Sequence, residues 1–316
     1  MVEELVSEVK PAVIRMIAWT VHKAFKNMFE KININMDMLE ELREIEKNSE
    51  LPIVLLPTHR SYFDFLIVSY IFFIYKLRLP NFVADEVLLQ AELLPFLVKS
   101  SGAFFFQRLL YAKSGLYRVV FDKYLELLLR EGSTLQFFIE GSRSRTGKIL
   151  APKLEVLNVV LDTLLFGKVA DVYLIPLTIN YEKVLESDTF PGELLGEEKV
   201  AESLVRVIKA SFIMRFNYGR VYVEICKPMT VRPFIDAVQK QNSQLKGQEL
   251  RSVLVSQLGK EIVMRLTNGI VIMSTSIVSS VLLMHRKGIS EDALIKFVNE
   301  LVKYILKKGY KVGGVN

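Results

Sequence analysis

The sequence predicts an α/β protein, with a mixed sheet, surrounding helices, and a helical segment flanking the sheet at each end. Short β-branched and aliphatic runs alternate with longer stretches of helical periodicity through the middle of the chain. On both sides of this region only helical spacing is found. The single cysteine, Cys226, excludes a disulfide framework and a cysteine-based metal site. We therefore expect a helical segment at 1–50, an α/β domain at 51–230 and a second helical segment at 231–316.

The first segment predicts helices over residues 3–48. Apolar residues recur at three- and four-residue spacing from Val13 to Met28, which is typical of an amphipathic helix. A second, charged helix is expected from Met38 to Asn48. Packing against the rest of the protein is the favoured role for the first helix, and contact with a membrane surface is the alternative.

The central region predicts short strands separated by helices. We expect strands at 52–56, 81–84, 103–106, 135–139, 173–179 and 220–225. We expect helices near 61–76, 86–99, 113–130, 153–165 and 199–212. In a sheet of this kind, functional groups are expected in the loops that follow the strands.

After Pro228 we expect no further strands. Helices are predicted at 231–242, 248–267, 269–287 and 289–308. The stretch from Gly269 to Met284 is apolar on most helical faces, so we expect it to be buried against the sheet or to touch lipid.

The composition indicates a protein that lies on a membrane without crossing it. Hydrophobic residues make up 51% of the chain, and the mean hydropathy is +0.28. The longest apolar runs, 65–75 and 269–284, are shorter than the ~20 residues that a spanning helix needs. The formal charge of +6 fits anionic lipid or phosphorylated ligands better than it fits nucleic acid.

A histidine and an aspartate follow the strand at 52–56. Ser61 with Asp64 three residues later has the form of a capping box, so we expect a helix to open at Ser61 with Asp64 in its first turn. His59, still in the loop, can fold back and reach that carboxylate. Such a pair suits general-base catalysis, because the carboxylate fixes the tautomer of the histidine and supports the imidazolium. A capped helix beside a surface histidine is the structural alternative.

Two further strands end or break in a way that suits a ligand site. The apolar strand at 103–106 leads to Arg108, which can hold a phosphate with two parallel hydrogen bonds, although a solvated charge is the plainer alternative. Pro176 lies inside the strand at 173–179, which implies a sheet edge or a break in the ladder. That break can shape an apolar groove, and a purely structural role is the alternative.

The loop after residue 139 concentrates unusual residues. It holds one carboxylate, two glycines, three hydroxyls and three cations, in the order Glu140, Gly141, Ser142, Arg143, Ser144, Arg145, Thr146, Gly147 and Lys148. Glycines permit close backbone approach, and the other groups suit a phosphate monoester. A P-loop is excluded because its glycine spacing is absent and Ile149 follows the lysine. No spacing of histidines and acids suggests a metal.

Taken in this order, the four stretches resemble the motifs of the glycerolipid acyltransferase family over about residues 50–230. The matching residues are His59 and Asp64; Gly102, Phe105 and Arg108; Phe138, Glu140, Gly141, Arg143, Ser144 and Arg145; and Pro176. The segment 192–203 is similar to the branch that acylates glycerol 3-phosphate or dihydroxyacetone phosphate, and the segments 55–57, 101–105 and 148–153 resemble the dihydroxyacetone-phosphate type more closely. Family members often have two arginines at the end of the second motif, where this chain has Gln107 before Arg108.

The resemblance implies a fatty acyl-CoA-dependent O-acyltransferase with no other cofactor. His59 is then the base and Asp64 holds it. The acceptor phosphate is expected at Arg108, Glu140, Gly141, Ser142, Arg143, Arg145 and Lys148, and Pro176 is expected to line an acyl groove. Dihydroxyacetone phosphate is the favoured acceptor, on a peroxisomal membrane, and glycerol 3-phosphate is the alternative, with the mitochondrial outer membrane or endoplasmic reticulum as alternative locations. A catalytically silent lipid-binding module and a kinase-like phosphate-binding protein are the rival classes.

Overall fold

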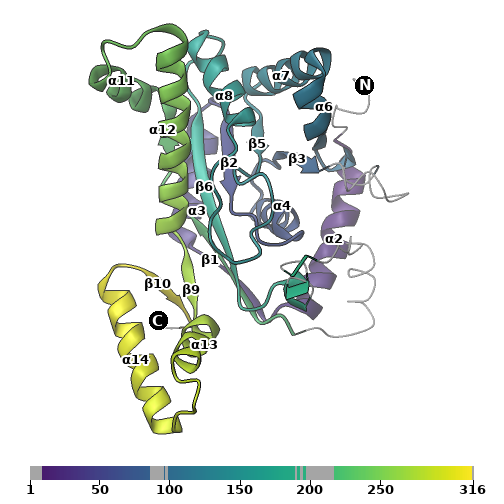
Figure 1. Ribbon diagram of the computed structural model, residues 1–316. Coiled ribbons are helices and arrows are strands. Elements are labelled where there is room, and N and C mark those ends of the chain that lie inside the picture. The colour runs from purple at the N-terminus through teal and green to yellow at the C-terminus, as the bar shows by residue number, and fades with distance from the viewer. Residues whose placement is uncertain are drawn as a thin grey trace.

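The computed structural model describes residues 9–85, 96, 99–188, 191–192, 195–196 and 217–314. Its centre is an eight-stranded mixed sheet with the order β1-β7-β6-β2-β5-β3-β4, in which β8 pairs with β6 (Figure 1). The pairings are parallel except those of β6 with β7 and with β8. The strands are β1 Lys31–Ile34, β2 Ile53–Pro57, β3 Asn81–Asp85, β4 Ala103–Phe106, β5 Thr134–Gln136, β6 Tyr173–Tyr181, β7 Arg220–Ile225 and β8 Met229–Thr230. The predicted fold class is confirmed.

Helices cover both faces of the sheet and give the molecule two apolar cores. Alternate residues of β2 point to opposite faces, as the two-residue period of a strand requires. Ile53 and Leu55 join the first core, and Val54 and Leu56 join the second. The first core is closed by α2 Pro11–Met28, α3 Met36–Asn48 and α4 Asp64–Ile74. The second is closed by α7 Gly115–Arg130, α8 Glu155–Leu165, α11 Val231–Gln241 and α12 Gly247–Asn268.

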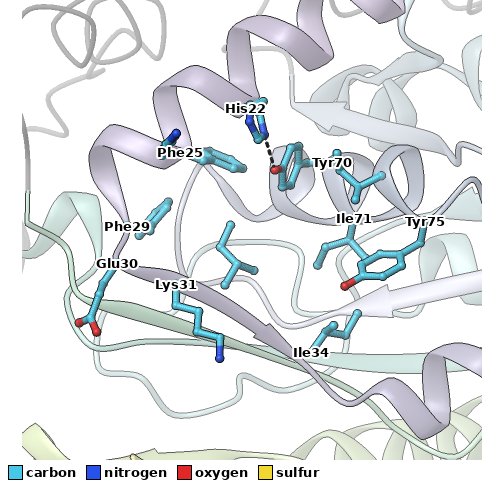
Figure 2. Close-up of a pocket in the computed structure, with 12 residues that line it drawn as sticks. His22, Phe25, Phe29, Glu30, Lys31, Ile34, Tyr70, Ile71 and Tyr75 are labelled. Carbon is cyan, nitrogen blue, oxygen red and sulfur yellow. Dashed lines mark hydrogen bonds between the residues drawn. The ribbon is translucent and has the colours of Figure 1, made fainter.

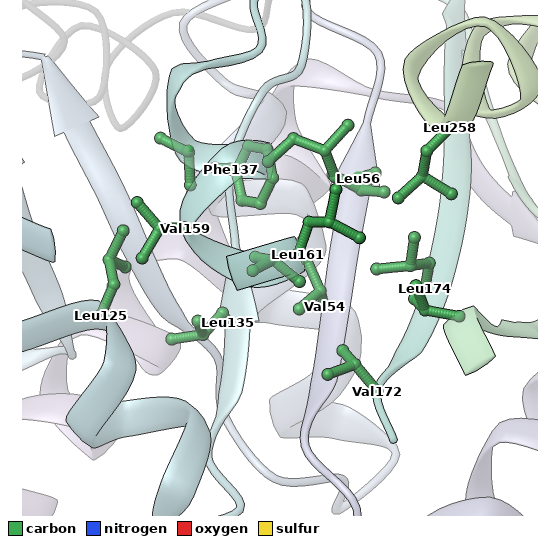
Figure 3. Close-up of a cluster of buried hydrophobic side chains, with 14 of the residues drawn as sticks. Val54, Leu56, Leu125, Leu135, Phe137, Val159, Leu161, Val172, Leu174 and Leu258 are labelled. Atoms are coloured by element: carbon green, nitrogen blue, oxygen red, sulfur yellow. The ribbon is translucent and has the colours of Figure 1, made fainter. Parts of the chain in front are cut away.

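Figure 3 shows the second core between the sheet and its helices. Val54, Leu135 and Leu174 come from three neighbouring strands, and Leu161 of α8 and Leu258 of α12 meet them. Each of these five side chains is at most 1% exposed. Burying one aliphatic side chain contributes about 1.5–3 kcal/mol. The strand β2, which leads to His59, is therefore held in place from both faces.

The C-terminal part adds a small second sheet, so the expectation that strands stop after Pro228 is wrong. Besides β8, strands β9 Val271–Met273 and β10 Lys311–Gly313 pair in parallel, with α13 Ser274–Met284 and α14 Glu291–Lys307 between them. Figure 1 shows this group beyond the end of α12. The helix expected at 269–287 is shorter because its first apolar residues form β9. Their partner strand lies about 40 residues later, beyond the reach of a local pattern.

Other predicted elements were shifted or missed. β1 falls inside the segment expected to be helical and pairs with the distant β7. The strand expected at 135–139 ends earlier, at Gln136, and a short helix α6 Arg108–Lys113 precedes α7. The helices expected at 86–99 and 199–212 lie largely outside the described residues. No helix in the described part of the chain is both long and apolar enough to span a membrane. The division of the chain at residues 50 and 230 stays a prediction.

Candidate active site

The site is built on the end of β2, a central strand. Beyond Pro57 the chain stays tied to β6, because the backbone N–H of Thr58 donates to the Leu177 carbonyl at 2.9 Å. The Thr58 hydroxyl accepts from the Ile179 N–H, also at 2.9 Å. Thr58 is fully buried. His59, the next residue, therefore follows a backbone position that is held firmly by β6. It lies in a loop, as the sequence predicts.

Asp64 is the first residue of α4 and lies against His59. Its Oδ2 is 3.1 Å from His59 Nδ1 and also accepts the backbone N–H groups of Arg60 at 2.6 Å and Ser61 at 2.8 Å. Its side chain is 0% exposed. Because a carboxylate accepts hydrogen bonds, it favours the tautomer with the proton on Nδ1 and leaves Nε2 to accept a proton.

The capping box is only half formed. The Asp64 carboxylate does reach back to the Ser61 N–H, but the Ser61 hydroxyl accepts from the Phe63 N–H at 3.2 Å instead of capping Asp64. The helix begins at Asp64 and not at Ser61. The Ser61 hydroxyl also donates to Glu186, an acid from a distant part of the chain, at 3.3 Å.

Tyr181, at the end of β6, completes the surroundings of Asp64. Its hydroxyl donates to Asp64 Oδ1 at 2.6 Å. Burial, reinforced by the negative charge of Asp64, raises the pKa of Tyr181 well above its usual value, so this hydroxyl stays a donor. Sequence reasoning missed this role, because Tyr181 lies 117 residues from Asp64 in the chain.

Glu140 fastens the histidine loop to the loop of the third motif. One carboxylate oxygen accepts the His59 backbone N–H at 2.8 Å and the other accepts the Leu150 N–H at 2.8 Å. Burial raises the pKa of Glu140, against the lowering effect of these two donors and of Arg60. The His59 ring also stacks on Phe138, with ring centroids 3.9 Å apart, and its side chain is 16% exposed. The histidine is thus fixed but still reachable.

Gly141 lets a cation from the second motif reach this loop. Its φ is +68°, and a Cβ there would lie 2.6 Å from Lys153 Cγ and 3.0 Å from Arg108 Nη2. Arg108, exposed at the start of α6, donates from Nη2 to the Gly141 carbonyl at 2.6 Å. The structure therefore brings Arg108 to the loop that also contacts His59.

The remaining predicted residues of the loop differ in their exposure. Ser142 and Lys148 are exposed, and Arg145 is half-buried. Arg143 is held inside: its side chain is 9% exposed, its Nη1 is 3.3 Å from Glu186 Oε1, and its guanidinium lies 3.8 Å from the centre of the Tyr62 ring. Ser144 closes the loop by donating its N–H to the His59 carbonyl at 2.8 Å.

Arg60 is a cation that sequence reasoning overlooked. Its Nε and Nη2 are buried and have no hydrogen-bond partner among the described residues. Burial lowers its pKa, and the nearby charges of Glu140 and Asp64 oppose that effect. The only signal in the sequence is its position directly after His59.

Pro176 lies inside the central strand β6, buried beside Leu56, and not at an edge of the sheet. The predicted break in the ladder is present on its other side, where β8 pairs with Leu174 and β7 pairs from Leu177 onward. The Pro176 carbonyl accepts from the Cys226 N–H at 2.9 Å. Burial raises the pKa of the Cys226 thiol to about 12, so this cysteine is a poor nucleophile.

A separate hollow of about 280 Å³ lies between α2, β1 and the end of α4 (Figure 2). Phe25, Phe29 and Ile71 line it, and His22 Nδ1 is 2.8 Å from the Tyr70 hydroxyl at one side. None of the predicted site residues lines this hollow. Among the described residues, no group of histidines, cysteines and acids could hold a metal ion.

Two family models together match most of the chain. Residues 33–180 match the model described as acyltransferase, and residues 191–315 match the glycerol-3-phosphate acyltransferase C-terminal region. Among solved structures, the chain has a looser likeness to the 1-acyl-sn-glycerophosphate acyltransferase PlsC of Thermotoga maritima, with 17% identity, a TM-score of 0.42 and coverage of 79% of each chain.

The curated relatives include dihydroxyacetone phosphate acyltransferases and mitochondrial glycerol-3-phosphate acyltransferases. The chain is 32% identical over 304 residues to dihydroxyacetone phosphate acyltransferase of Homo sapiens, covering 93% of this chain and 44% of that protein. It is 30% identical over 353 residues to mitochondrial glycerol-3-phosphate acyltransferase 1 of Homo sapiens, covering 98% and 42%. The chain spans less than half the length of these relatives. On these matches, the chain belongs to the glycerolipid acyltransferase family, in the branch of the glycerol-3-phosphate and dihydroxyacetone-phosphate acyltransferases.

Proposed function

We propose that this chain transfers a fatty acyl group from acyl-CoA to the primary hydroxyl of dihydroxyacetone phosphate, with His59 as the general base. One observation carries the proposal. The buried Asp64 contacts His59 at Nδ1, and the loop of the third motif binds the His59 backbone through Glu140. Arg108 of the second motif contacts this same loop at Gly141. A fixed base beside cations is what transfer to a phosphorylated alcohol requires.

In the proposed reaction, His59 Nε2 takes the proton of the acceptor hydroxyl as its oxygen attacks the thioester carbonyl carbon. The tetrahedral intermediate then expels the sulfur of CoA, which takes the proton back from the imidazolium. Asp64 stabilises that imidazolium. No acyl-enzyme is needed, and the buried thiol of Cys226 is unsuited to form one.

The acceptor phosphate is proposed to lie over the third-motif loop. Arg108 and Lys148 offer exposed cations there, and Ser142 offers an exposed hydroxyl. Arg143 and Arg145 lie on the same loop, and Glu140 and Gly141 set its shape through the contacts described above. We also propose that Pro176, buried in the sheet beside the strand that leads to His59, supports the wall of an acyl groove.

The two possible acceptors differ at one carbon atom. Dihydroxyacetone phosphate and glycerol 3-phosphate share the phosphate and a primary hydroxyl, and differ by a ketone or a secondary alcohol at the middle carbon. A site that donates a hydrogen bond there accepts both, whereas a site that needs a donor from the substrate rejects the ketone. The motif likeness and the names of several relatives support dihydroxyacetone phosphate.

The test is a competition assay with both acceptors at equal concentration, purified protein and a long-chain acyl-CoA. We expect a kcat/KM ratio that favours dihydroxyacetone phosphate. A ratio favouring glycerol 3-phosphate would overturn the acceptor assignment and keep the acyltransferase. Absence of turnover with both acceptors would support the alternative of a catalytically silent lipid-binding module.

We propose that the protein works on a membrane surface, with the peroxisomal membrane favoured over the mitochondrial outer membrane or endoplasmic reticulum. Large apolar side chains are exposed on α2, α6 and α7, namely Met16, Trp19, Leu109, Leu116 and Val119. Such side chains, together with the positive net charge of the protein, suit shallow contact with anionic lipid. Flotation with vesicles should show binding that high salt or alkaline carbonate reverses at least in part.

A further inference from the structure

We propose that Glu186 is a positioning residue that fixes Arg143 and the Ser61–Tyr62 turn for acceptor binding. This inference rests on the proposed function and extends it, because Glu186 lies outside all four motifs. The residue sits in the short 3₁₀ helix Leu185–Asp188, after β6. It is 2% exposed, although an acid at such a position costs several kcal/mol to bury unless it is well paired.

One oxygen of Glu186 gathers donors from two motifs. Its Oε1 accepts the Tyr62 N–H at 2.8 Å and the Ser61 hydroxyl at 3.3 Å, both from the turn between His59 and Asp64. The same oxygen is 3.3 Å from Arg143 Nη1, in the third motif. Glu186 thus connects two parts of the site: the turn that follows the proposed base, and the loop that is proposed to bind the phosphate.

Together with Tyr62, this acid determines how the Arg143 guanidinium is oriented. The Tyr62 ring lies 3.8 Å from the centre of the guanidinium and restricts its position from one side. The Glu186 carboxylate, 3.3 Å from Nη1, attracts the guanidinium from a second direction. An arginine that is oriented before the ligand arrives loses less conformational freedom on binding, and so binds a phosphate more tightly.

The charge state of Glu186 matters for this role. Burial raises its pKa, and the nearby carboxylate of Asp64 raises it further, whereas the Tyr62 N–H and Arg143 lower it. Tyr181 is also close to this charge, because its hydroxyl donates to the neighbouring acid Asp64. Replacing the acid by glutamine keeps an oxygen for the Tyr62 N–H, but it removes the negative charge opposite Arg143.

The experiment measures KM for both substrates in Glu186→Gln and Glu186→Asp. We expect the acceptor KM to rise roughly tenfold in Glu186→Gln and less in Glu186→Asp, which keeps the charge, with the acyl-CoA KM unchanged. Glu182→Gln is the matched control, since Glu182 lies four residues earlier and accepts from the Arg220 N–H, outside the candidate site. It should behave like the unchanged protein.

A double-variant cycle separates positioning from a general structural role. In an Arg143→Gln background, Glu186→Gln should raise the acceptor KM by less than about twofold, because the pair is already broken. Additive effects, or equal rises in both KM values, would overturn the proposal. If Glu186→Gln fails to fold, the same cycle with Glu186→Asp decides. If the wild-type protein is inactive, the proposed function is refuted. If the wild-type protein is active and the acceptor KM is the same in the Glu186 variants, only this inference is refuted.

Discussion

The two halves of the candidate site are built in opposite ways. Around His59 the acids are buried: Asp64, Glu140 and Glu186 are at most 2% exposed, and each accepts at least two donors. On the side proposed to bind the phosphate, Arg108 and Lys148 are exposed. The proposed base must be held at a fixed distance from the reacting hydroxyl, whereas the exposed cations proposed to bind the phosphate stay open to an entering ligand.

This difference predicts how variants of the two halves divide between kinetic constants. Changes to the buried half remove the base or move it, and therefore lower kcat. Changes to the exposed half remove binding of one substrate, and therefore raise its KM. Arg143 and Glu186 are largely buried but connect the two halves, so their variants are expected to raise the acceptor KM instead of lowering kcat.

The largest effect is expected from His59→Ala. Without the base, acyl transfer should fall below a few per cent of the unchanged rate, while the melting temperature should change little because His59 is a loop residue outside both apolar cores. Turnover is measured with saturating acyl-CoA and acceptor. Retention of more than a few per cent, in a folded variant, would mean that another group is the base.

Asp64→Asn should come next. An amide can present its N–H₂ to His59 Nδ1 and stabilise the wrong tautomer, a change that lowers kcat about 10⁴-fold in the Ser-His-Asp triad, so the loss should be nearly as large as for His59→Ala. Tyr181→Phe removes only one neutral donor to Asp64, so about 0.5–1.5 kcal/mol, or at most about tenfold in kcat, is expected. Equal losses in the two variants would contradict the assigned roles.

The exposed half should respond through the acceptor KM. Arg108→Ala should raise that KM about ten- to a hundredfold, since a lost charged hydrogen bond costs about 1.5–3 kcal/mol, and the acyl-CoA KM should not change. Arg130→Ala, an exposed arginine at the end of α7, is the control. An unaltered acceptor KM in Arg108→Ala would remove Arg108 from the phosphate site.

The smallest effect concerns Cys226. With a pKa of about 12, only about one thiol in 10,000 is ionised at pH 8, and the thiolate is the reactive form. Iodoacetamide at pH 8 should therefore leave the activity unchanged over an hour. Rapid loss of activity with one modified cysteine would show that the thiol is exposed or lies in the site.

The sequence predicted the parts of the site that lie close together in the chain. His59, Asp64 and the loop at 140–148 were found because a strand, a turn and unusual polar residues follow one another. Tyr181, Glu186 and Arg60 were missed, because their roles depend on which strands become neighbours and which acids become buried. The β9–β10 pairing was missed for the same reason, since no local pattern shows a parallel partner on the far side of two helices.

The most direct test of the account is acceptor binding by His59→Ala and Arg108→Ala, measured by calorimetry with dihydroxyacetone phosphate and no acyl-CoA. We predict that His59→Ala binds within about threefold of the unchanged protein while it turns over almost nothing, and that Arg108→Ala binds at least about tenfold more weakly. Loss of binding in His59→Ala, together with normal binding in Arg108→Ala, would contradict the division between a buried base and exposed phosphate-binding cations.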